Sequence, residues 1–400
     1  MQIPEKIRTI LETLNAKGYE AYNVGGCVRD YLMGNTPSDY DITTNALPEE
    51  VMECFSGYTV VPTGLKHGTV TVVVGGENIE ITTYRVEGTY SDNRHPDSVS
   101  FTRDIEGDLS RRDFTMNAIA MDIDGNLRDP FAGVDDIRAK RIVCVGDADR
   151  RFCEDGLRIL RGVRFASVLG FDVEKSCEEA IRRNKKLLAN ISRERIYTEL
   201  SKLILGKDVQ KILTYYNDII FEIIPGIDAE LYSQAVHAIS RAEADIYIRL
   251  ALLLGSCGSC DKAVGALRSL KCDNKTIVNV KLLLTEGGCR MSCDRVSVRK
   301  LLSRIGYENY FMLVKYNQAY FAEDFSPCAQ LAEDIRLKGD CISISALAAD
   351  GTYLASMGMK GAQIGATLKD VLQKVMEEKL DNNIEEITNY INHTKSEQKF

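Results

Sequence analysis

The chain has 400 residues, of which 44% are hydrophobic, and a net charge of −8 at pH 7. This length predicts two or more packed domains. No apolar run approaches the roughly 20 residues that a membrane span needs. The 12 cysteines are scattered and follow no secretory segment, so we expect a cytoplasmic protein with reduced thiols and no membrane contact.

The acidic total does not exclude nucleic-acid binding, because phosphate contacts need only a local basic face. Arginine and lysine gather at 138–164 and again at 182–195. Such charge runs usually form solvated helix faces. The regular spacing of Arg158, Arg161 and Arg164 argues against that reading for these three.

The sequence has two regions with different secondary-structure patterns. Residues 1–22 predict an amphipathic surface helix with Ile7, Ile10, Leu11 and Leu14 on its apolar side. Short strands are then expected at 59–62, 69–75, 78–84 and 116–123, with turns at the Gly75-Gly76 pair and at 124–125. After about residue 150 helical periodicity continues to the end. We therefore predict the α+β class, with a small mixed-sheet head followed by an all-helical remainder.

The chemistry begins at residues 24–42, where a Gly25-Gly26 pair is followed by Asp39 and Asp41. Two acids spaced by two project from the same face of a strand. Their mutual repulsion favours a bound cation, and hard oxygen ligands suit magnesium, which also binds phosphates. The glycine pair lets backbone N–H groups approach a triphosphate. Each signal is weak alone, but this order and separation are specific.

This segment resembles the signature of the DNA polymerase β nucleotidyltransferase superfamily. The resemblance implies a third carboxylate on a neighbouring strand. Glu80 is the best candidate, because it alternates with two core-facing isoleucines at 79 and 81. Asp113 and Asp122 compete for the role, and Glu80 could instead be an ordinary solvent-facing residue.

Two further blocks carry polar residues at defined spacing. In residues 111–118, Arg112, Asp113 and Asn117 can contact phosphate and ribose hydroxyls, or form a buried ion pair with a structural Asn. In residues 154–165, Asp155 and Arg158 step by three, so we expect them and Arg161 to form one helical ridge. A carboxylate acceptor beside a guanidinium donor can pair with the edge of a base. The alternative is that these residues form i, i+3 ion pairs that only stabilise the helix.

Together the three blocks resemble, over almost the whole chain, the class II CCA-adding enzymes, a group that includes bacterial poly(A) polymerases, and specifically the bacterial branch without an HD domain. The resemblance implies a polymerase-β-like head at 1–137, a neck with the nucleotide-selecting helix at 138–205, a helical body at 206–310 and a tRNA-binding tail at 311–400. Residues 191–196 resemble the neck helix of the family, and residues 361–368 resemble its closing motif.

The resemblance also implies residue roles. Asp39 and Asp41 would be the metal ligands, with Glu80 as the third catalytic acid. Asp155 and Arg158 would select the base. The remaining nucleotide contacts implied are Gly25, Gly26, Arg29, Arg112, Asp113, Asn117, Arg161 and Arg164.

The reaction implied is two-metal nucleotidyl transfer on Mg²⁺, in which C, C and A are added to the tRNA 3′ end from CTP and ATP without a template, with release of pyrophosphate. Switching from C to A requires a change of pocket geometry. The Gly-, Ser-, Asp- and Asn-rich residues 86–106 are expected to form a flexible loop that drives it. Truncation within 88–98 should then abolish A addition and spare C addition.

Alternatives share the same head motifs. They are a bacterial poly(A) polymerase, a CC-only or A-only tRNA nucleotidyltransferase, and a tRNA-binding relic without activity. The intact Asp39, Asp41, Asp155 and Arg158 argue against the relic. Cys257 and Cys260 are separated by two residues, as zinc ligands often are. A zinc site is nevertheless disfavoured, because the cysteines downstream (Cys272, Cys289 and Cys293) do not repeat that spacing. His67 is expected in a turn near the site, His95 lies in the loop, and no phosphatase activity is expected. The oligomeric state is not determined by these features.

Overall fold

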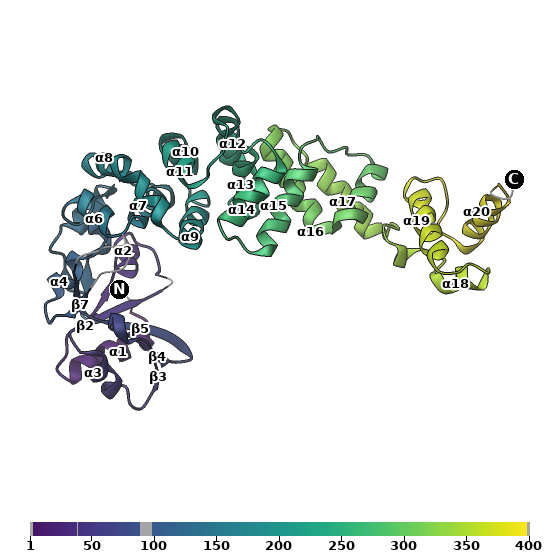
Figure 1. Ribbon diagram of the computed structural model, residues 1–400. Coiled ribbons are helices and arrows are strands. Elements are labelled where there is room, and N and C mark those ends of the chain that lie inside the picture. Colours follow the sequence, from purple (N-terminus) through teal and green to yellow (C-terminus); the bar gives the residue numbers. More distant parts are fainter. Residues whose placement is uncertain (1–2, 38, 89–97, 398–400) are drawn as a thin grey trace. The chain divides into compact units, whose positions relative to one another are not determined.

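The computed structural model describes residues 3–37, 39–88 and 98–397. The chain divides into two compact units, Met1–Gly226 with Ser269–Lys271, and Ile227–Arg268 with Cys272–Phe400 (Figure 1). The first unit contains the sheet and the second is helical, so the predicted α+β class is confirmed. The finer boundaries at 137, 205 and 310 remain predictions.

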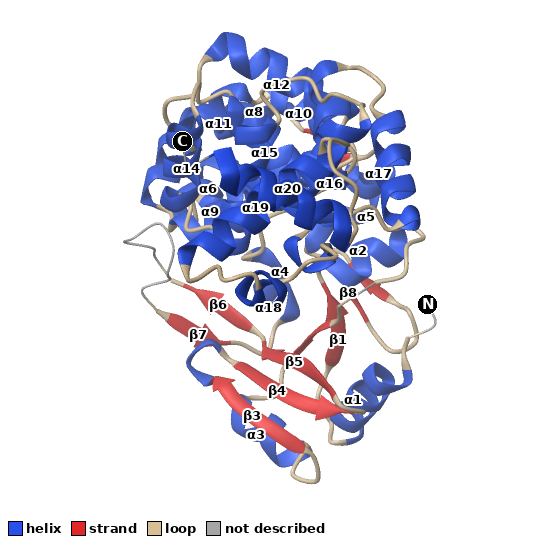
Figure 2. Ribbon diagram, turned by 90° about the vertical axis from the view of Figure 1, so that its right-hand side faces the viewer, coloured by secondary structure: helices blue, strands red, loops and turns tan. Residues whose placement is uncertain are grey.

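The head is built on one mixed sheet with the strand order β3-β4-β5-β2-β1-β8-β9 (Figure 2). The central strands β2 and β5 are parallel, and the other described pairs of this sheet are antiparallel. The strands are β1 Ala21–Val24, β2 Asp41–Thr44, β3 Thr59–Gly64, β4 Thr69–Val74, β5 Glu77–Thr83, β8 Ala120–Met121 and β9 Leu127–Arg128.

Three of the four predicted strands are confirmed as β3, β4 and β5, and the turns at Gly75-Gly76 and at Gly125 have the positive φ that favours glycine. The predicted strand 116–123 is mostly wrong, because a 3-10 turn, η2 Thr115–Asn117, leaves only β8 extended. Strand β1 was not predicted. All four of its residues are buried, so the sequence carries no alternation to reveal it.

Helices α1 Glu5–Ala16 and α3 Pro48–Cys54 cover one face of the sheet. The predicted N-terminal helix is confirmed as α1, whose four apolar residues are completely buried in one core with α3. Full burial of each such side chain contributes about 1.5–3 kcal/mol. A second core, on Tyr22, Val24 and Tyr84, lies on the other side of β1. The opposite face of β4 and β5 stays accessible, since their residues alternate between buried and more exposed positions, and Glu80 lies on that face.

The predicted flexible loop is partly ordered. Its ends form an antiparallel pair, β6 Arg85–Glu87 with β7 Val99–Phe101, followed by α4 Ile105–Ser110. Residues 89–97, with His95, lie outside the described residues, so the expected role of the loop is untested.

The rest of the first unit is a helical layer. A short parallel pair, β10 Arg141–Ile142 with β11 Asp172–Val173, is its one exception to the expected helices among the described residues. Its helices are α2 Gly26–Leu32, α5 Gly133–Arg138, α6 Ala148–Glu154, α7 Leu157–Leu169, α8 Lys175–Asn184, α9 Arg193–Ile204, α10 Val209–Tyr215 and α11 Asn217–Ile223, with 3-10 turns η1 Leu65–His67 and η3 Lys185–Asn190.

The second unit is helical where it is described. Its longest helix, α16, kinks at Gly306, where φ is 76°. The helices are α12 Ala229–Arg241, α13 Ile246–Gly255, α14 Cys260–Ser269, α15 Asn274–Glu286, α16 Arg295–Phe321, α17 Ser326–Lys338, η4 Ile344–Ala346, α18 Gly351–Ser356, α19 Ala362–Met376 and α20 Ile384–Glu397. No single helix of the described ranges is long and apolar enough to span a membrane; α13 and α14 pass by length and composition only as a pair bent by 119°.

The cysteines depart from expectation in one place. Cys293 and Cys328 form a disulfide, which ties the segment before α16 to α17, so the prediction of reduced thiols is wrong for this pair. Cys293 was one of the cysteines in the zinc alternative, and in the disulfide its sulfur cannot act as a thiolate ligand. Cys257 and Cys260 lie at a helix end and a helix start, as ordinary helices predict.

Candidate active site

The glycine pair forms the tight turn between β1 and α2. Gly25 has φ 73° and ψ −129°, which a side chain would strain. A Cβ at this position would also lie 3.0 Å from Arg112 Nη1 and 3.9 Å from Asp41 Oδ2. The turn therefore brings backbone, a cation and a carboxylate together.

Asp41 begins β2, in register with Val24 of β1, and Asp39 lies two residues before it. Partial desolvation by the surrounding protein raises the pKa of the Asp41 carboxyl, although the residue keeps exposed surface. The positive charge of Arg112 lowers this pKa and the negative charge of Asp39 raises it further. Asp39 acts on Asp41 as a like charge two residues away along the chain. Hard, mutually repelling oxygens of this kind fit a divalent cation.

Glu80 lies on β5 beside these acids. Ile42 of β2 pairs with Ile81 in the parallel ladder, so the residues just before them, Asp41 and Glu80, share the opposite face of the sheet. Glu80 is exposed, with its side chain on the predicted face. In the described ranges, no three His, Cys, Asp or Glu side chains are gathered closely enough to hold a metal ion. The identity of the third acid thus stays a prediction.

The two competitors for that role are engaged elsewhere. Asp122 closes the β8–β9 turn by accepting hydrogen bonds from the backbone of Asp124 and from the backbone and side chain of Asn126. Asp113 is buried and binds Arg161. Neither carboxylate is available to the cation site in this geometry.

Asp113 is the centre of a buried polar chain. Oδ1 accepts from the backbone N–H of Phe114 and from Asn117 Nδ2, at 2.8 and 3.1 Å, and Oδ2 accepts from Arg161 Nε at 2.7 Å. Burial raises the pKa of Asp113, but Arg161 and Asn117 outweigh it and lower the value to about 2. Both oxygens are engaged, so this geometry does not support the predicted sugar contact for Asp113.

The chain continues on both sides of Asp113. Asn117 Oδ1 accepts from Arg29 Nη1 at 2.7 Å, and the Arg29 side chain also pairs with Asp30. On the other side, Glu199 of α9 pairs with Arg161 at 3.6 Å and with Arg164 at 2.8 Å. The polar chain thus joins α2 to α7 and α9. Glu199 was not predicted, because nothing in the sequence near residue 199 connects it to residues 113 or 161.

The expected ridge of Asp155, Arg158 and Arg161 is wrong in one member. Asp155 has extended backbone between α6 and α7, and its Oδ1 accepts from the N–H of Leu157 at the start of α7. Its partner is Arg195 of α9, at 2.7 Å. The acid therefore lies at the helix N-terminus, where a carboxylate is stabilised by free N–H groups, while Arg158 and Arg161 lie on the helix.

Arg158 is buried and held from three sides. Nη1 donates to Glu154 at 2.7 Å and to the carbonyl of Arg151 at 3.2 Å, and Nη2 donates to the carbonyl of Arg111 at 2.9 Å. A guanidinium carries five N–H groups. The N–H of Nε and the second N–H of Nη2 have no partner among the described residues.

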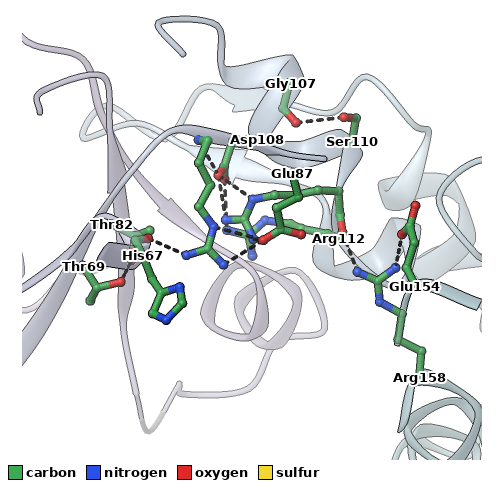
Figure 3. Close-up of polar contacts among 12 residues, drawn as sticks. His67, Thr69, Thr82, Glu87, Gly107, Asp108, Ser110, Arg112, Glu154 and Arg158 are labelled. Carbon is green, nitrogen blue, oxygen red and sulfur yellow. Dashed lines mark hydrogen bonds and ion pairs between the residues drawn. The ribbon is translucent and has the colours of Figure 1, made fainter. Parts of the chain in front are cut away.

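Figure 3 shows how this arginine is connected to the β6–β7 pair. Glu87 accepts from Arg85 Nη2 at 2.8 Å and from Arg111 Nη1 at 3.3 Å. Asp108, completely buried, pairs with Arg111 at 2.7 Å and with Arg112 at 3.5 Å. Arg85 also donates to the carbonyl of His67, which ends the 3-10 turn η1, so His67 is a turn residue as expected, and its nearness to the site remains a prediction. Glu87 and Asp108 were not predicted.

Comparison with known proteins gives two family matches. Residues 21–143 match the poly A polymerase head domain, and residues 170–231 match a probable RNA- and SrmB-binding site of polymerase A. The CCA-adding enzyme of Geobacillus kaustophilus is 48% identical over 228 residues, which is 57% of this chain and 56% of that protein. That of Bacillus cereus (strain 03BB102) is 52% identical over 206 residues, 52% and 51% of the two. The match thus spans about half the length of these curated relatives.

Solved structures extend the likeness to the whole chain. The crystal structure of the Bacillus stearothermophilus CCA-adding enzyme in complex with CTP matches with a TM-score of 0.85 and 32% identity, and covers 100% of both chains. The Thermotoga maritima CCA-adding enzyme complexed with tRNA shares the fold at a TM-score of 0.67 and 21% identity, over 98% of this chain and 96% of that one. This protein therefore belongs to the family of CCA-adding enzymes and poly(A) polymerases, as the three sequence blocks predicted.

Proposed function

We propose that the protein is a CCA tRNA nucleotidyltransferase, which adds C, C and A to the tRNA 3′ end from CTP and ATP and releases pyrophosphate. The observation that supports this most directly is the meeting of Asp41, Arg112 and the glycine turn within 4 Å of one Cβ position. A paired acid beside a cation and a tight backbone turn suits a metal-bound triphosphate. The full-length match to a CCA-adding enzyme in complex with CTP supports the same activity.

Nucleotidyltransferases of this family use divalent metal ions. We assign Mg²⁺ to Asp39 and Asp41, with Glu80 as the third acid, because Asp41 and Glu80 share one face of the sheet and Asp39 lies two residues before Asp41. When bound, Mg²⁺ supplies Lewis-acid stabilisation of the triphosphate and of the attacking 3′-hydroxyl. The residues of the chain contribute binding and orientation, and no protein nucleophile is needed.

The triphosphate contacts fall to the glycine turn and the cations around it. The Gly25-Gly26 backbone allows a phosphate to approach closely. A Cβ at Gly25 would lie 3.0 Å from Arg112 Nη1, and a Cβ at Gly26 would lie 3.6 Å from Arg29 Nη2. The Nε of Arg112 is buried without a hydrogen-bond partner in the described part of the chain, a state that a bound phosphate oxygen would relieve. Asn117, fixed by Asp113, orients Arg29 toward the same place.

Base selection falls to Asp155 and Arg158. The two N–H groups of Arg158 that have no partner in the described structure offer a donor pair to the edge of a base. Asp155 offers acceptor lone pairs, which it shares with Arg195. A wrong base leaves these buried groups unpaired, which costs about 1–3 kcal/mol per group. Arg161 and Arg164 support the nucleotide from the next turns of α7.

The test uses the purified chain, Mg²⁺ and tRNA lacking its CCA end, with labelled CTP, ATP or both, resolved at single-nucleotide length. Two C additions and one A, followed by a stop, are expected. Long A tracts would replace the proposal by a poly(A) polymerase, and a stop after CC, or A addition alone, by a partial enzyme. Bound tRNA without extension would indicate a relic. Asp41→Asn is the matched inactive control, and cell fractionation would test the expected cytoplasmic location.

A further inference from the structure

Three guanidiniums surround one aromatic ring in the first unit. The guanidinium carbon of Arg164 lies 3.5 Å from the centroid of the Phe165 ring, that of Arg29 lies 5.2 Å away, and that of Arg161 lies 5.4 Å away. All three distances are within the range of cation–π attraction. The ring itself is 3% exposed, and Phe114 packs against it edge-on at 5.8 Å. The ring therefore faces a group of cations as well as the core.

Arg164 keeps unused hydrogen-bond donors beside its carboxylate partner. Its side chain is 11% exposed, and its one described polar partner is Glu199, bound through Nε. The other four of its five N–H groups have no partner among the described residues. Burial lowers the pKa of Arg164, Glu199 opposes this, and Arg161 lowers it further by repulsion. A bound anion would remove that repulsion and satisfy the donors.

The group borders the glycine turn. A Cβ on Gly26 would lie 3.6 Å from Arg29 Nη2, and Arg29 Nη1 is fixed by Asn117. Three bonds occupy the N–H groups of Arg29, two to Asp30 and one to Asn117, which leaves two for a ligand. The cations around Phe165 thus lie beside the place proposed for the triphosphate.

We propose that Phe165 is a positioning residue of the nucleotide site, whose ring holds Arg29, Arg161 and Arg164 as one phosphate-binding cradle. Each of the three is also paired with a carboxylate, Asp30, Asp113 or Glu199. The π face adds an attraction that uses no N–H group, so the remaining donors of the three stay available for a phosphate. The inference deepens the proposed function, but it concerns phosphate binding and does not depend on turnover.

The test compares Phe165→Leu with Phe114→Leu. Both changes remove an aromatic ring from the same buried pair, but no guanidinium lies over Phe114 in the described structure. Calorimetric titration with Mg²⁺-pyrophosphate and Mg²⁺-CTP should give about tenfold weaker binding for Phe165→Leu, the loss of about 1.4 kcal/mol of cation–π attraction. Phe114→Leu should bind within about twofold of the wild type at a similar loss of stability.

Steady-state kinetics identify the source of the phosphate. A raised KM for CTP with little change in kcat assigns the cradle to the triphosphate, whereas a raised KM for tRNA alone assigns it to a phosphate of the RNA strand. Equal binding losses in both Leu variants, or none in either, would overturn the proposal. If Phe165→Leu does not fold, Phe165→Met, whose flexible side chain can fill the space of the ring without a π face, should show the same weakened pyrophosphate binding. A chain that binds CTP through Phe165 but extends no tRNA would keep this inference and reject the proposed function.

Discussion

Replacing Arg161 by Met tests the buried charge cluster on which the site is built. Arg161 is paired with Asp113 and Glu199, whose side chains are 9% and 6% exposed. The change would leave both carboxylates buried without their shared cation. Removing one partner of a buried pair costs about 3–5 kcal/mol. Because Arg161 itself is 32% exposed and water screens part of its charge, we expect about 3 kcal/mol at pH 7.

The pKa of Asp113 gives a separate measure of this magnitude. Its folded-state value of about 2 lies below the ordinary 3.8, a difference of about 2 units, or roughly 2.5 kcal/mol. A depressed folded-state pKa contributes stability that is present above the unfolded pKa and is lost as the pH falls through the folded value. The difference between wild type and Arg161→Met should therefore be largest at neutral pH and should narrow below about pH 4.

The assay is urea unfolding followed by far-ultraviolet circular dichroism, because the chain has no tryptophan to report by fluorescence. Arg183→Met is the matched control, since the Arg183–Asp149 pair is exposed at 55% and 44% and should contribute less than about 1 kcal/mol. The double variant Asp113→Asn with Arg161→Met should recover part of the loss. A cost below about 1 kcal/mol for Arg161→Met, or one independent of pH, would refute the reasoning.

Three further changes test other parts of the site. Gly25→Ala should reduce kcat/KM for CTP by about 100-fold or more, because its Cβ would displace the guanidinium of Arg112, which we propose binds the triphosphate. Gly34→Ala, with φ 80° and open space around it, measures the backbone strain alone, and equal effects on activity would contradict the explanation. Asp155→Asn should lower the preference for CTP over UTP, measured as a ratio of kcat/KM, while Asp149→Asn should not. Glu87→Gln should destabilise the β6–β7 pair by about 1–3 kcal/mol and slow A addition more than C addition; single-turnover rates with CTP and with ATP that fall equally would show that the pair does not affect nucleotide choice.

Local pattern was sufficient where a feature depends on neighbours in the chain. The period of Ile7, Ile10, Leu11 and Leu14 places helix α1 and its buried face, because a helix repeats every 3.6 residues whatever packs against it. The Gly25-Gly26 turn followed by Asp41 at a strand start was likewise predictable. Backbone sterics and side-chain alternation are local properties.

Local pattern failed where a few residues of backbone depart from the expected element. The spacing of Asp155 and Arg158 suggested one continuous helix, but α6 ends at Glu154 and α7 begins only at Leu157. Spacing cannot distinguish a ridge within a helix from a residue at its N-terminus. The difference matters chemically, because it directs Asp155 to Arg195 of α9 and not to the arginines of its own helix.

The sequence by itself therefore determined the fold class, and it supplied the acidic pair and the basic residues proposed for the site, since each depends on residue types at short spacing. Only the tertiary structure decided which charges meet. Asp113 binds an arginine 48 residues away, Arg164 binds Glu199 35 residues away, and the ring of Phe165 collects cations from two helices. Such partners are chosen by how helices pack in three dimensions, and electrostatic energy depends on distance and burial that spacing along the chain does not contain.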